Sequence, residues 1–559
     1  MPLICLDSTD LCIQSLPLQN VAVLRDETAR DDAPDSSNRS TTSHVKSKRR
    51  RPIEKIQYDY FHRPLGENQQ NDGNWQPANP VDKTTGLWYD PEPYSKNGAD
   101  WADLVPKFLQ HGYSSALGLK SQANHPLLMV ERSYNPPPLR QQLLEILMEE
   151  MSCPAVFFAR DATLACYACG RTTSTVVDVG YYATTVTPVY DGYVEQKGIR
   201  KCPIAAEAMD ELALSHLQSL AKHQTVVPLW QVKYPHAQRH PAFHRLALLQ
   251  IAKDSRESGA GQSVNAAASK TLHVPSVSYT LPDGQTVDVP SMHRFAVADM
   301  LLGRSHEDHA DGGGGGGGGQ GGSNGSASAE EMMGDSPSPR QQAVTACRKE
   351  FSTMLLNLSH GNENESDDED DDAKQEQQQL QSNAGQNAKK YTEATAVGIS
   401  SRRTTRGGAA AIKKQKEQVF KVPFSNRQLQ RACASYFQSQ MDQWTASPIA
   451  GMVCDAAFKC DRDQQASLLG NVVLGGGGAC IGPTDQAVPD LLRDQIETMI
   501  HTHTPGWRVK LLSPGIQERA ICSWLGGSIL GSLGTFHDMW ITKAEYDEWG
   551  SAVVNRKCP

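Results

Sequence analysis

Long apolar stretches are missing from this sequence of 559 residues. No run of about 18 apolar residues occurs, which excludes a membrane-spanning helix. Apolar residues make up 38% of the chain, below the ~45–50% of an ordinary globular protein. The first residues carry acidic side chains where a secretory signal would carry basic ones. We therefore expect neither export nor a membrane partner.

A regular cysteine framework and an excess of basic charge are missing as well. The 13 cysteines are scattered and odd in number, which is typical of reduced thiols in the cytosol or nucleus. Acidic residues (63) outnumber basic ones (54), giving a net charge of −9. This balance argues against a surface that coats nucleic acid.

The shortage of apolar residues is concentrated in one block, residues 305–420. It contains the glycine run Gly312–Gly319, the acidic run Asp367–Asp372 and basic residues between Arg402 and Lys416. Such a composition cannot bury a core. We expect a disordered insertion within one domain, because ordered sequence texture returns after it. Its charged runs are either simply solvated or a partner-binding tail.

The remaining sequence alternates between strand and helix patterns. Short apolar runs at His125–Val130, Ala155–Ala159 and Ser174–Val177 are typical of buried strands. A helix is expected to start at Asn135-Pro136-Pro137, since apolar side chains then recur at helical spacing. Residues Tyr279–Val287, with Pro-Asp-Gly at the turn, predict a β-hairpin. This rhythm predicts a mostly parallel sheet covered by helices.

Two strands are followed directly by an aspartate and a turn. Asp178 and Gly180 follow the apolar residues Val176 and Val177, and Asp7 follows a similar strand near the start of the chain. Two such carboxylates facing each other across a cleft could hold a hydrated divalent cation. The same pattern also occurs in ordinary turns, so it does not establish a site by itself.

A glycine loop follows a third apolar strand, Asn471–Leu474. Gly475, Gly476, Gly477 and Gly478 would let the backbone approach a ligand closely, and a helix N-terminus after them would attract phosphate. No Gly-Lys-Ser/Thr follows, which excludes the common lysine-containing phosphate loop. Phosphate or nucleotide binding and a purely structural turn both remain open.

Other candidate ligands carry less weight. Cys166 and Cys169 have metal or redox spacing, but no second pair exists, so we interpret them as buried thiols. His236, His240 and His244 recur every four residues, yet Pro241 is expected to interrupt that helix. We therefore expect no metal site at either place.

The last part of the chain resembles the end of actin. The matching residues are Glu518-Arg519, Ser523–Leu530, Ser532-Leu533, Thr535-Phe536, Met539–Ile541, Glu545-Tyr546 and Arg556–Cys558. Further matches occur in actin order at Gly170–Asp178, Asp191–Tyr193, Leu281–Gly284 and Lys459–Asp461. Within actins, Asn97–Trp101, His125–Met129 and the ending Lys-Cys-Pro make the chain look most like the actin-related protein 4 subfamily of nuclear chromatin complexes.

The resemblance implies an α/β, actin-like fold of two ribonuclease-H-like domains flanking a nucleotide cleft that holds ATP with Mg. It divides the chain as follows: residues 1–25, degenerate first strands of the body; 26–52, a polar basic linker; 53–123, a divergent small-subdomain insertion; 124–304, the first part of the body; 305–420, the disordered insertion; 421–559, the C-terminal part of the body.

The resemblance also implies that the nucleotide site is damaged. Tyr181 and Tyr182 stand where actin has Asp-Gly, and an aromatic residue cannot copy the close backbone approach of glycine. Asp161 replaces the water-positioning Gln, Thr185 its His partner and Ala520 the adenine-side Lys. In the first hairpin, Thr9–Leu11 and Gln14 replace the Gly-Ser-Gly turn and the phosphate-contacting Lys. Only vestiges remain: Asp7, Asp178, Gly180, Gly475, Gly476 and Gly477.

We therefore expect no hydrolysis, and binding of ATP with Mg that is weak or lost. The implied function is a non-catalytic scaffold subunit of nuclear chromatin-remodelling or histone-acetyltransferase complexes. Its expected partners are an actin monomer and a helical segment of another subunit, with histones a further candidate. The basic cluster Lys46–Arg51 fits nuclear import or a solvated linker. The alternative is an ATP-binding cytoskeletal actin; a sugar kinase would lack the actin-like ending.

Overall fold

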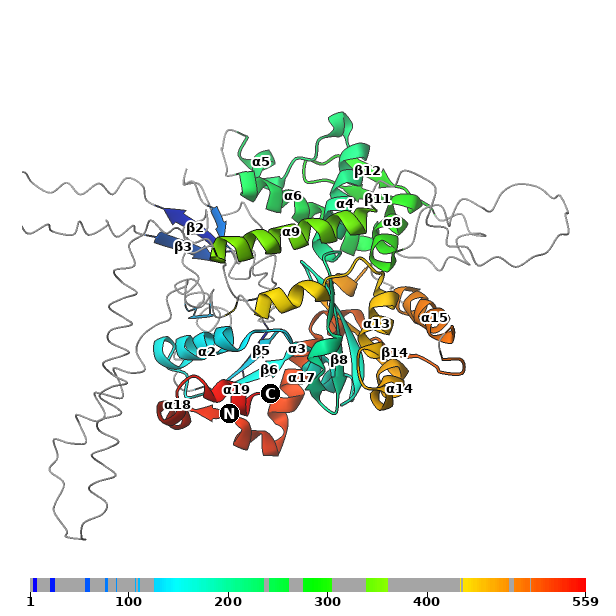
Figure 1. The fold of residues 1–559 in the computed structure, drawn as a ribbon. Coiled ribbons are helices and arrows are strands. Elements are labelled where there is room, and N and C mark those ends of the chain that lie inside the picture. The colour runs from blue at the N-terminus through cyan, green and yellow to red at the C-terminus, as the bar shows by residue number, and fades with distance from the viewer. Residues whose placement is uncertain are drawn as a thin grey trace, which may run out of the picture. The chain divides into compact units, whose positions relative to one another are not determined.

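The computed structural model (Figure 1) describes residues 4–7, 21–25, 56–60, 76–78, 87, 106, 109–110, 125–235, 241–260, 275–303, 338–359, 433, 436–481, 487–502 and 504–559. The chain forms two units, residues 1–351 with 435–559, and residues 352–434. The expectations for Thr9–Leu11, Gln14, Lys46–Arg51, Gly312–Gly319, Asp367–Asp372 and Arg402–Lys416 lie outside the described residues. None of the described helices combines the length and apolar character needed to cross a membrane.

The first sheet of the larger unit has four strands in the order β1-β5-β6-β15. Strands β1 (Ile4–Asp7), β5 (Leu127–Glu131) and β6 (Ala155–Arg160) are parallel, and β15 (Ile541–Thr542) is antiparallel to β6. All of β5 is buried. This explains its unbroken apolar run, because a parallel strand covered on both faces has no side for polar residues.

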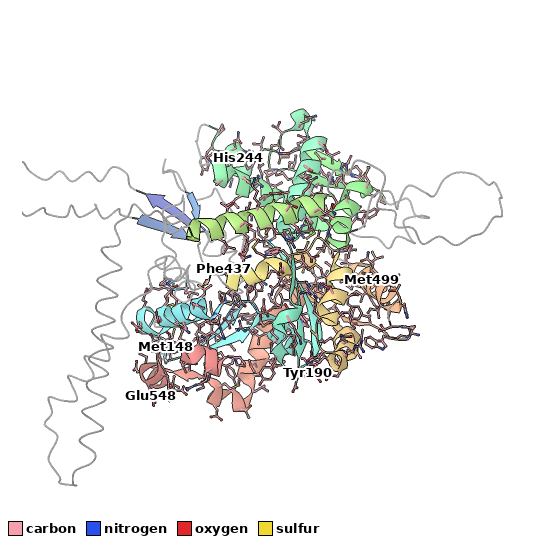
Figure 2. The ribbon with its side chains drawn as sticks, in the orientation of Figure 1. Met148, Tyr190, His244, Phe437, Met499 and Glu548 are labelled. Atoms are coloured by element: carbon pink, nitrogen blue, oxygen red, sulfur yellow. The ribbon has the colours of Figure 1, made fainter. Side chains whose placement is uncertain are left out.

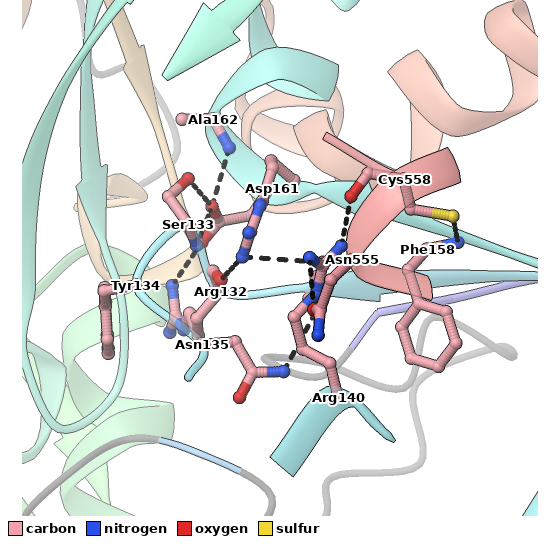
Figure 3. A network of polar contacts seen from close by, with 12 residues as sticks. Arg132, Ser133, Tyr134, Asn135, Arg140, Phe158, Asp161, Ala162, Asn555 and Cys558 are labelled. Carbon is pink, nitrogen blue, oxygen red and sulfur yellow. Dashed lines mark hydrogen bonds and ion pairs between the residues drawn. The ribbon is translucent and has the colours of Figure 1, made fainter. Parts of the chain in front are cut away.

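Helices of this half follow the strands closely. Pro137 is the first residue of α2 (Pro137–Glu145), as predicted from the proline that suits a first helical turn. Helix α3 (Asp161–Ala168) begins immediately after β6. Near the chain end, α18 (Lys543–Trp549) and α19 (Val553–Lys557) follow β15. Arg140 of α2 donates to the Cys558 carbonyl oxygen at 2.5 Å, which ties α2 to the residue after α19 (Figure 3).

The second sheet has six strands. Its path runs β10 (Arg200–Cys202), β8 (Thr184–Tyr190), β7 (Ser174–Val179), β13 (Asn471–Gly475) and β14 (Lys510–Leu512), and β9 (Tyr193–Val194) pairs with β8. Only β7, β13 and β14 run parallel, so the sheet is mixed rather than mostly parallel. The reason is the short turn between β7 and β8, in which the Gly180 amide donates to the Ala183 carbonyl oxygen at 3.1 Å, because so short a connection makes the two strands antiparallel. Asp191 and Gly192, with φ angles of 49° and 83°, turn the chain again between β8 and β9.

Helices α13 (Ile449–Phe458), α14 (Arg462–Gly470) and α15 (Ala487–His501) contribute to the core of this half. A further group comprises α4 (Ala206–Leu220), α5 (Leu229–Lys233), α6 (Pro241–Ser255) and α8 (Ser291–Leu302). The predicted hairpin is confirmed as β11 (Val277–Thr280) and β12 (Thr286–Val289). Separately, β2 (Val21–Arg25) pairs with β3 (Ile56–Tyr60) and β4 (Gln76–Ala78).

The helical pattern breaks at Pro241, as expected: α6 begins at this residue, because proline is well suited to a first turn. His244 of α6 packs edge-on against the Trp230 ring at 5.7 Å. His236 and His240 lie outside the described residues.

One correction concerns part of the block 305–420, because Pro339–Ser359 form helix α9 where we expected disorder. Arg340 fixes its start by donating to the carbonyl oxygens of Met300 and Ala446, at 2.7 and 3.1 Å. Farther along, Phe351 is fully buried and meets the Phe437 ring edge-on at 6.1 Å (Figure 2 labels Phe437). These long-range contacts stabilise a helix whose overall composition is polar.

Helix α17 (Cys522–Ser532) lies directly against α3 (Figure 1), and the Cys522 thiol donates to the Ala165 carbonyl oxygen at 3.7 Å. The approach is closest at Gly526, where an added Cβ would lie 1.8 Å from the Leu164 carbonyl oxygen. Only glycine fits this crossing. The pair α3–α17 closes one side of the pocket described next.

Candidate functional site

A pocket lies where β7, the loop after β13, α3 and α17 converge. Its empty volume is about 530 Å³, part of it open to solvent. The lining residues are Asp161, Ala162, Ala165, Val176, Asp178, Gly180, Tyr181, Thr185, Thr187, Gly475, Gly476, Gly477, Ala520, Cys522 and Ser523. Five residues singled out from the sequence therefore line one pocket: Asp178, Gly180, Gly475, Gly476 and Gly477.

The position of Asp7 is described only through its backbone. It ends β1, and its Cα pairs in register with that of Val130 on β5. The carboxyl ends of parallel neighbouring strands meet at the same edge of a sheet, so Asp7 lies beside the segment that follows β5. The structure does not describe the side chain of Asp7.

The glycine loop packs on the end of β7. Gly476 has a φ of +91°, and a Cβ there would lie 2.4 Å from the Val179 carbonyl oxygen and 2.5 Å from Asp178 Oδ1. Gly478 is equally confined by Val179 and Gly180. The glycines are thus required for the loop to approach β7. The expected helix does not follow them at once, because Gly477–Ala479 form a single 3₁₀ turn.

The residues that the resemblance placed at lost catalytic positions also line this pocket. Asp161, Thr185 and Ala520 are all present in its wall. Tyr181 lines it too, half-buried, with the Tyr182 ring edge-on at 4.9 Å. The peptide between Tyr181 and Tyr182 is fixed by a hydrogen bond from the Glu207 amide to the Tyr181 carbonyl oxygen at 2.8 Å. The Tyr181–Tyr182 pair therefore occupies an ordered turn at the pocket edge.

An arginine that sequence reasoning missed crosses the back of the site. Arg132 Nη1 donates to Asp178 Oδ2 at 2.6 Å and to Asp161 Oδ2 at 3.2 Å. Its side chain is only 9% exposed, as is that of Asp161. Arg132 directly follows β5, so a charged residue after the run Leu127–Val130 was the available signal.

The other carboxylate oxygen of Asp161, Oδ1, also accepts hydrogen bonds from the chain (Figure 3). Asp161 Oδ1 accepts hydrogen bonds from the Ser133 amide at 2.9 Å, the Ser133 hydroxyl at 2.5 Å and the Ala162 amide at 2.7 Å. Asp161 is thus held by Arg132, Ser133 and the first turn of α3. The favourable end of the helix dipole adds to this anchoring.

Burial and charge determine the ionisation of the cluster. Burial raises the pKa of the Asp178 carboxyl, and the Arg132 guanidinium opposes that shift. Burial by itself would lower the pKa of Arg132, but Tyr134, Asp178 and Asp161 together raise it, so the guanidinium stays charged. Two carboxylates and one fixed cation leave the cluster at about one net negative charge.

A second buried basic residue, Lys201, lies against Tyr134, two positions after Arg132. Lys201 is 1% exposed; its Nζ lies 3.2 Å from the centre of the Tyr134 ring and donates to Gln440 Oε1 at 2.6 Å. Burial, followed by repulsion from Arg132, lowers the pKa of Lys201 well below its ordinary value. Arg132 is therefore the group that keeps its positive charge here.

A polyphosphate with its divalent cation does not fit these residues. No lysine or arginine is among the described residues that line the pocket. The oxygens that would bind a cation, Asp178 Oδ2 and Asp161 Oδ2, already bind Arg132. Within the described ranges, no three His, Cys, Asp or Glu side chains gather in a way that could hold a metal ion. A pocket with two carboxylates and no free cation repels phosphate.

Comparison with known sequences identifies the family. The family model described as Actin matches residues 94–357 and 410–559. The chain belongs to the actin family. This confirms the predicted actin-like α/β fold. The match runs through most of α9, in agreement with the correction made above for that helix.

Relatives within the actin family agree on one subfamily. Actin-related protein 4 of Arabidopsis thaliana is 25% identical over 476 residues, which cover 82% of this chain and 77% of the plant protein. The protein of the same name from Schizosaccharomyces pombe is 25% identical over 452 residues, 78% of this chain and 77% of the yeast protein. That of Emericella nidulans is 27% identical over 442 residues, 78% and 71% of the two chains. The predicted resemblance to this subfamily is confirmed.

Proposed function

We propose that this chain is a non-catalytic actin-family subunit of a nuclear chromatin-remodelling or histone-acetyltransferase complex. In this proposal it acts as a scaffold that pairs with an actin monomer and a helical segment of a larger subunit. Its similarity to proteins named actin-related protein 4 supports the assignment. Histones are a further candidate partner.

The cluster of Arg132, Asp161 and Asp178 carries the non-catalytic part of this proposal. Hydrolysis of a phosphoanhydride requires positive groups near the transferred phosphate and a positioned water. Here the one permanent cation of the cluster is bound by two carboxylates, and Asp161 stands at the position of the water-positioning residue. The charge pattern therefore opposes phosphoryl transfer.

Exposed apolar side chains support a docking role. Ile529, 40% exposed, lies in the last turn of α17, and Leu533, 49% exposed, is the C-cap residue of that helix, four positions later. Such spacing puts them on one face of the helix. An exposed apolar pair at helical spacing is the type of surface that accepts an amphipathic partner helix.

Affinity purification of the tagged full-length chain from nuclear extract tests the scaffold role. We expect co-purification of an actin monomer with remodeller ATPase or acetyltransferase subunits. The double variant Ile529→Asp/Leu533→Asp should lose the helical partner. Val232→Asp, at an apolar residue 41% exposed on α5, is the matched control and should retain it. Cytoskeletal partners alone would overturn the proposal.

Two assays separate this function from that of an ATP-binding cytoskeletal actin. Purified protein should release no more phosphate from Mg-ATP than the Asp178→Ala control. It should also remain in the supernatant after high-speed centrifugation in polymerising salt. Magnesium-dependent turnover above the control, or pelleting, would instead support the cytoskeletal alternative.

A further inference from the structure

Asp161 and Asp178 converge on a single nitrogen atom. Arg132 Nη1 lies 2.6 Å from Asp178 Oδ2 and 3.2 Å from Asp161 Oδ2. Bridging two carboxylates from different elements, here α3 and β7, is what a divalent cation does in an oxygen-ligand site. We infer that the Arg132 guanidinium is a built-in substitute for the divalent cation, so that the pocket is stable without metal or nucleotide. This deepens the proposed function, since it rests on the same non-catalytic pocket.

The guanidinium and a metal ion exclude each other sterically. A bound Mg²⁺ or Ca²⁺ would need the same Oδ2 atoms at roughly 2.0–2.6 Å, inside the space that Nη1 fills. The second nitrogen lies close to Gly180, where an added Cβ would be 3.2 Å from Arg132 Nη2.

The backbone fixes the arginine where the cation would be. The peptide group between Arg132 and Ser133 is anchored at both of its polar atoms: the Ser133 amide donates to Asp161 Oδ1 at 2.9 Å, and Arg160 Nη1 donates to the Arg132 carbonyl oxygen at 3.3 Å. Arginine suits this position because its planar fork bridges two acceptors and stays charged when buried. The position of the Arg132 guanidinium is thus fixed by the anchored backbone next to it.

A consequence follows for the protein without the guanidinium. Two buried carboxylates would face each other with no counter-charge, which is strongly destabilising. A divalent cation could then enter and restore neutrality, because both Oδ2 atoms would be free. Arg132 therefore conceals a latent divalent-cation site.

Thermal unfolding of the full-length chain tests this inference. The Tm of the natural protein should be the same in EDTA, MgCl2 and CaCl2. The Tm of Arg132→Met should fall by on the order of 10 °C in EDTA and rise again, saturably, with Ca²⁺ or Mg²⁺. Adding Asp161→Asn to this variant should abolish the response to the cations, because one ligand is lost.

Arg200→Met is the matched control. Arg200 is a buried arginine in the same unit, but it pairs with Asp455, whose side chain is 53% exposed. Its loss should lower the Tm without creating any response to divalent cations, because a single half-exposed carboxylate is a poor ligand set.

Several results would overturn the inference. One is a Tm of the natural protein that rises with Mg²⁺ or Ca²⁺, since metal would then bind with Arg132 in place. Another is an Arg132→Met variant whose Tm ignores both cations, or which fails to fold with and without them. Recovery of cytoskeletal partners would defeat the proposed function and leave these melting curves unchanged, so the two failures are distinguishable.

Discussion

Gly526 is the position where a single methyl group should have the largest effect. It lies inside α17, where that helix crosses α3, and both helices border the pocket. A Cβ on residue 526 would lie 1.8 Å from the Leu164 carbonyl oxygen and 2.5 Å from its carbonyl carbon. These are backbone atoms, so no rotamer change can relieve the overlap. The two helices must separate by roughly 1 Å instead.

The expected cost combines two opposing terms. Overpacking of a closely packed interior costs about 1–3 kcal/mol, and a backbone clash belongs at the upper end of that range. Alanine regains about 0.5–1 kcal/mol over glycine within a helix. Gly526→Ala should therefore lower the free energy of unfolding by about 2 kcal/mol.

Urea unfolding followed by circular dichroism measures this difference. Gly470→Ala is the matched control, because Gly470 also lies in a helix, α14, and a Cβ there meets nothing within 4 Å. The control should be neutral or slightly stabilised. An unfolding midpoint for Gly526→Ala equal to that of Gly470→Ala would refute the close-crossing explanation.

Three further predictions concern acid stability, thiol reactivity and α9. The Glu545 pKa is lowered, chiefly by the hydrogen bond from Lys557. The Glu545 carboxylate therefore stabilises the folded protein at pH values above its unfolded pKa of 4.5, and this stabilisation is lost as the pH falls through the folded pKa. The Tm difference between the natural protein and Glu545→Gln should shrink over that acid range. A hydrogen bond with Cys522 lowers the Cys169 pKa, and Cys169 is half-buried; peptide mass spectrometry should find it alkylated by iodoacetamide before the fully buried thiols. Arg340→Met should increase hydrogen exchange at the start of α9, since carbonyl oxygens of two other segments lose their donor; unchanged exchange would contradict that anchoring role.

Local sequence patterns were sufficient for much of the α/β body. The apolar runs predicted at His125–Val130 and Ala155–Ala159 coincide with most of β5 and β6, and the helix expected to start at Asn135-Pro136-Pro137 begins at Pro137. The turn chemistry of Pro282–Gly284 correctly predicted the β11–β12 hairpin. These features depend on residues close in sequence, which explains why they were predictable.

Helix α9 depends on contacts that no local window contains. Its neighbours in sequence are rich in glycine and acidic residues, so composition averaged over 305–420 concealed it. What stabilises the helix is remote in sequence: Arg340 reaches Ala446, and Phe351 reaches Phe437. Tertiary packing here overrode a weak local propensity.

The pocket, too, was only partly predictable from the sequence. The aspartate and glycine motifs predicted which strand ends meet, since each follows an apolar strand; the structure places Asp178 and Gly475–Gly477 around one hollow. Nothing in the sequence indicates which cation Asp178 faces, because Arg132 is 46 positions away. Binding of a nucleotide, weak or lost, remains a prediction.

Arg132 and Asp161 are physically interdependent. Asp161 without Arg132 would add a second buried carboxylate beside Asp178, and Arg132 without Asp161 would lose one of its two acceptors. Each residue thus makes the other tolerable, and together they join the end of β5 to α3 and β7 by ion pairs. In the scaffold role proposed above, a pocket bridged by its own charges would not depend on a ligand for its conformation, so the docking surface would stay constant.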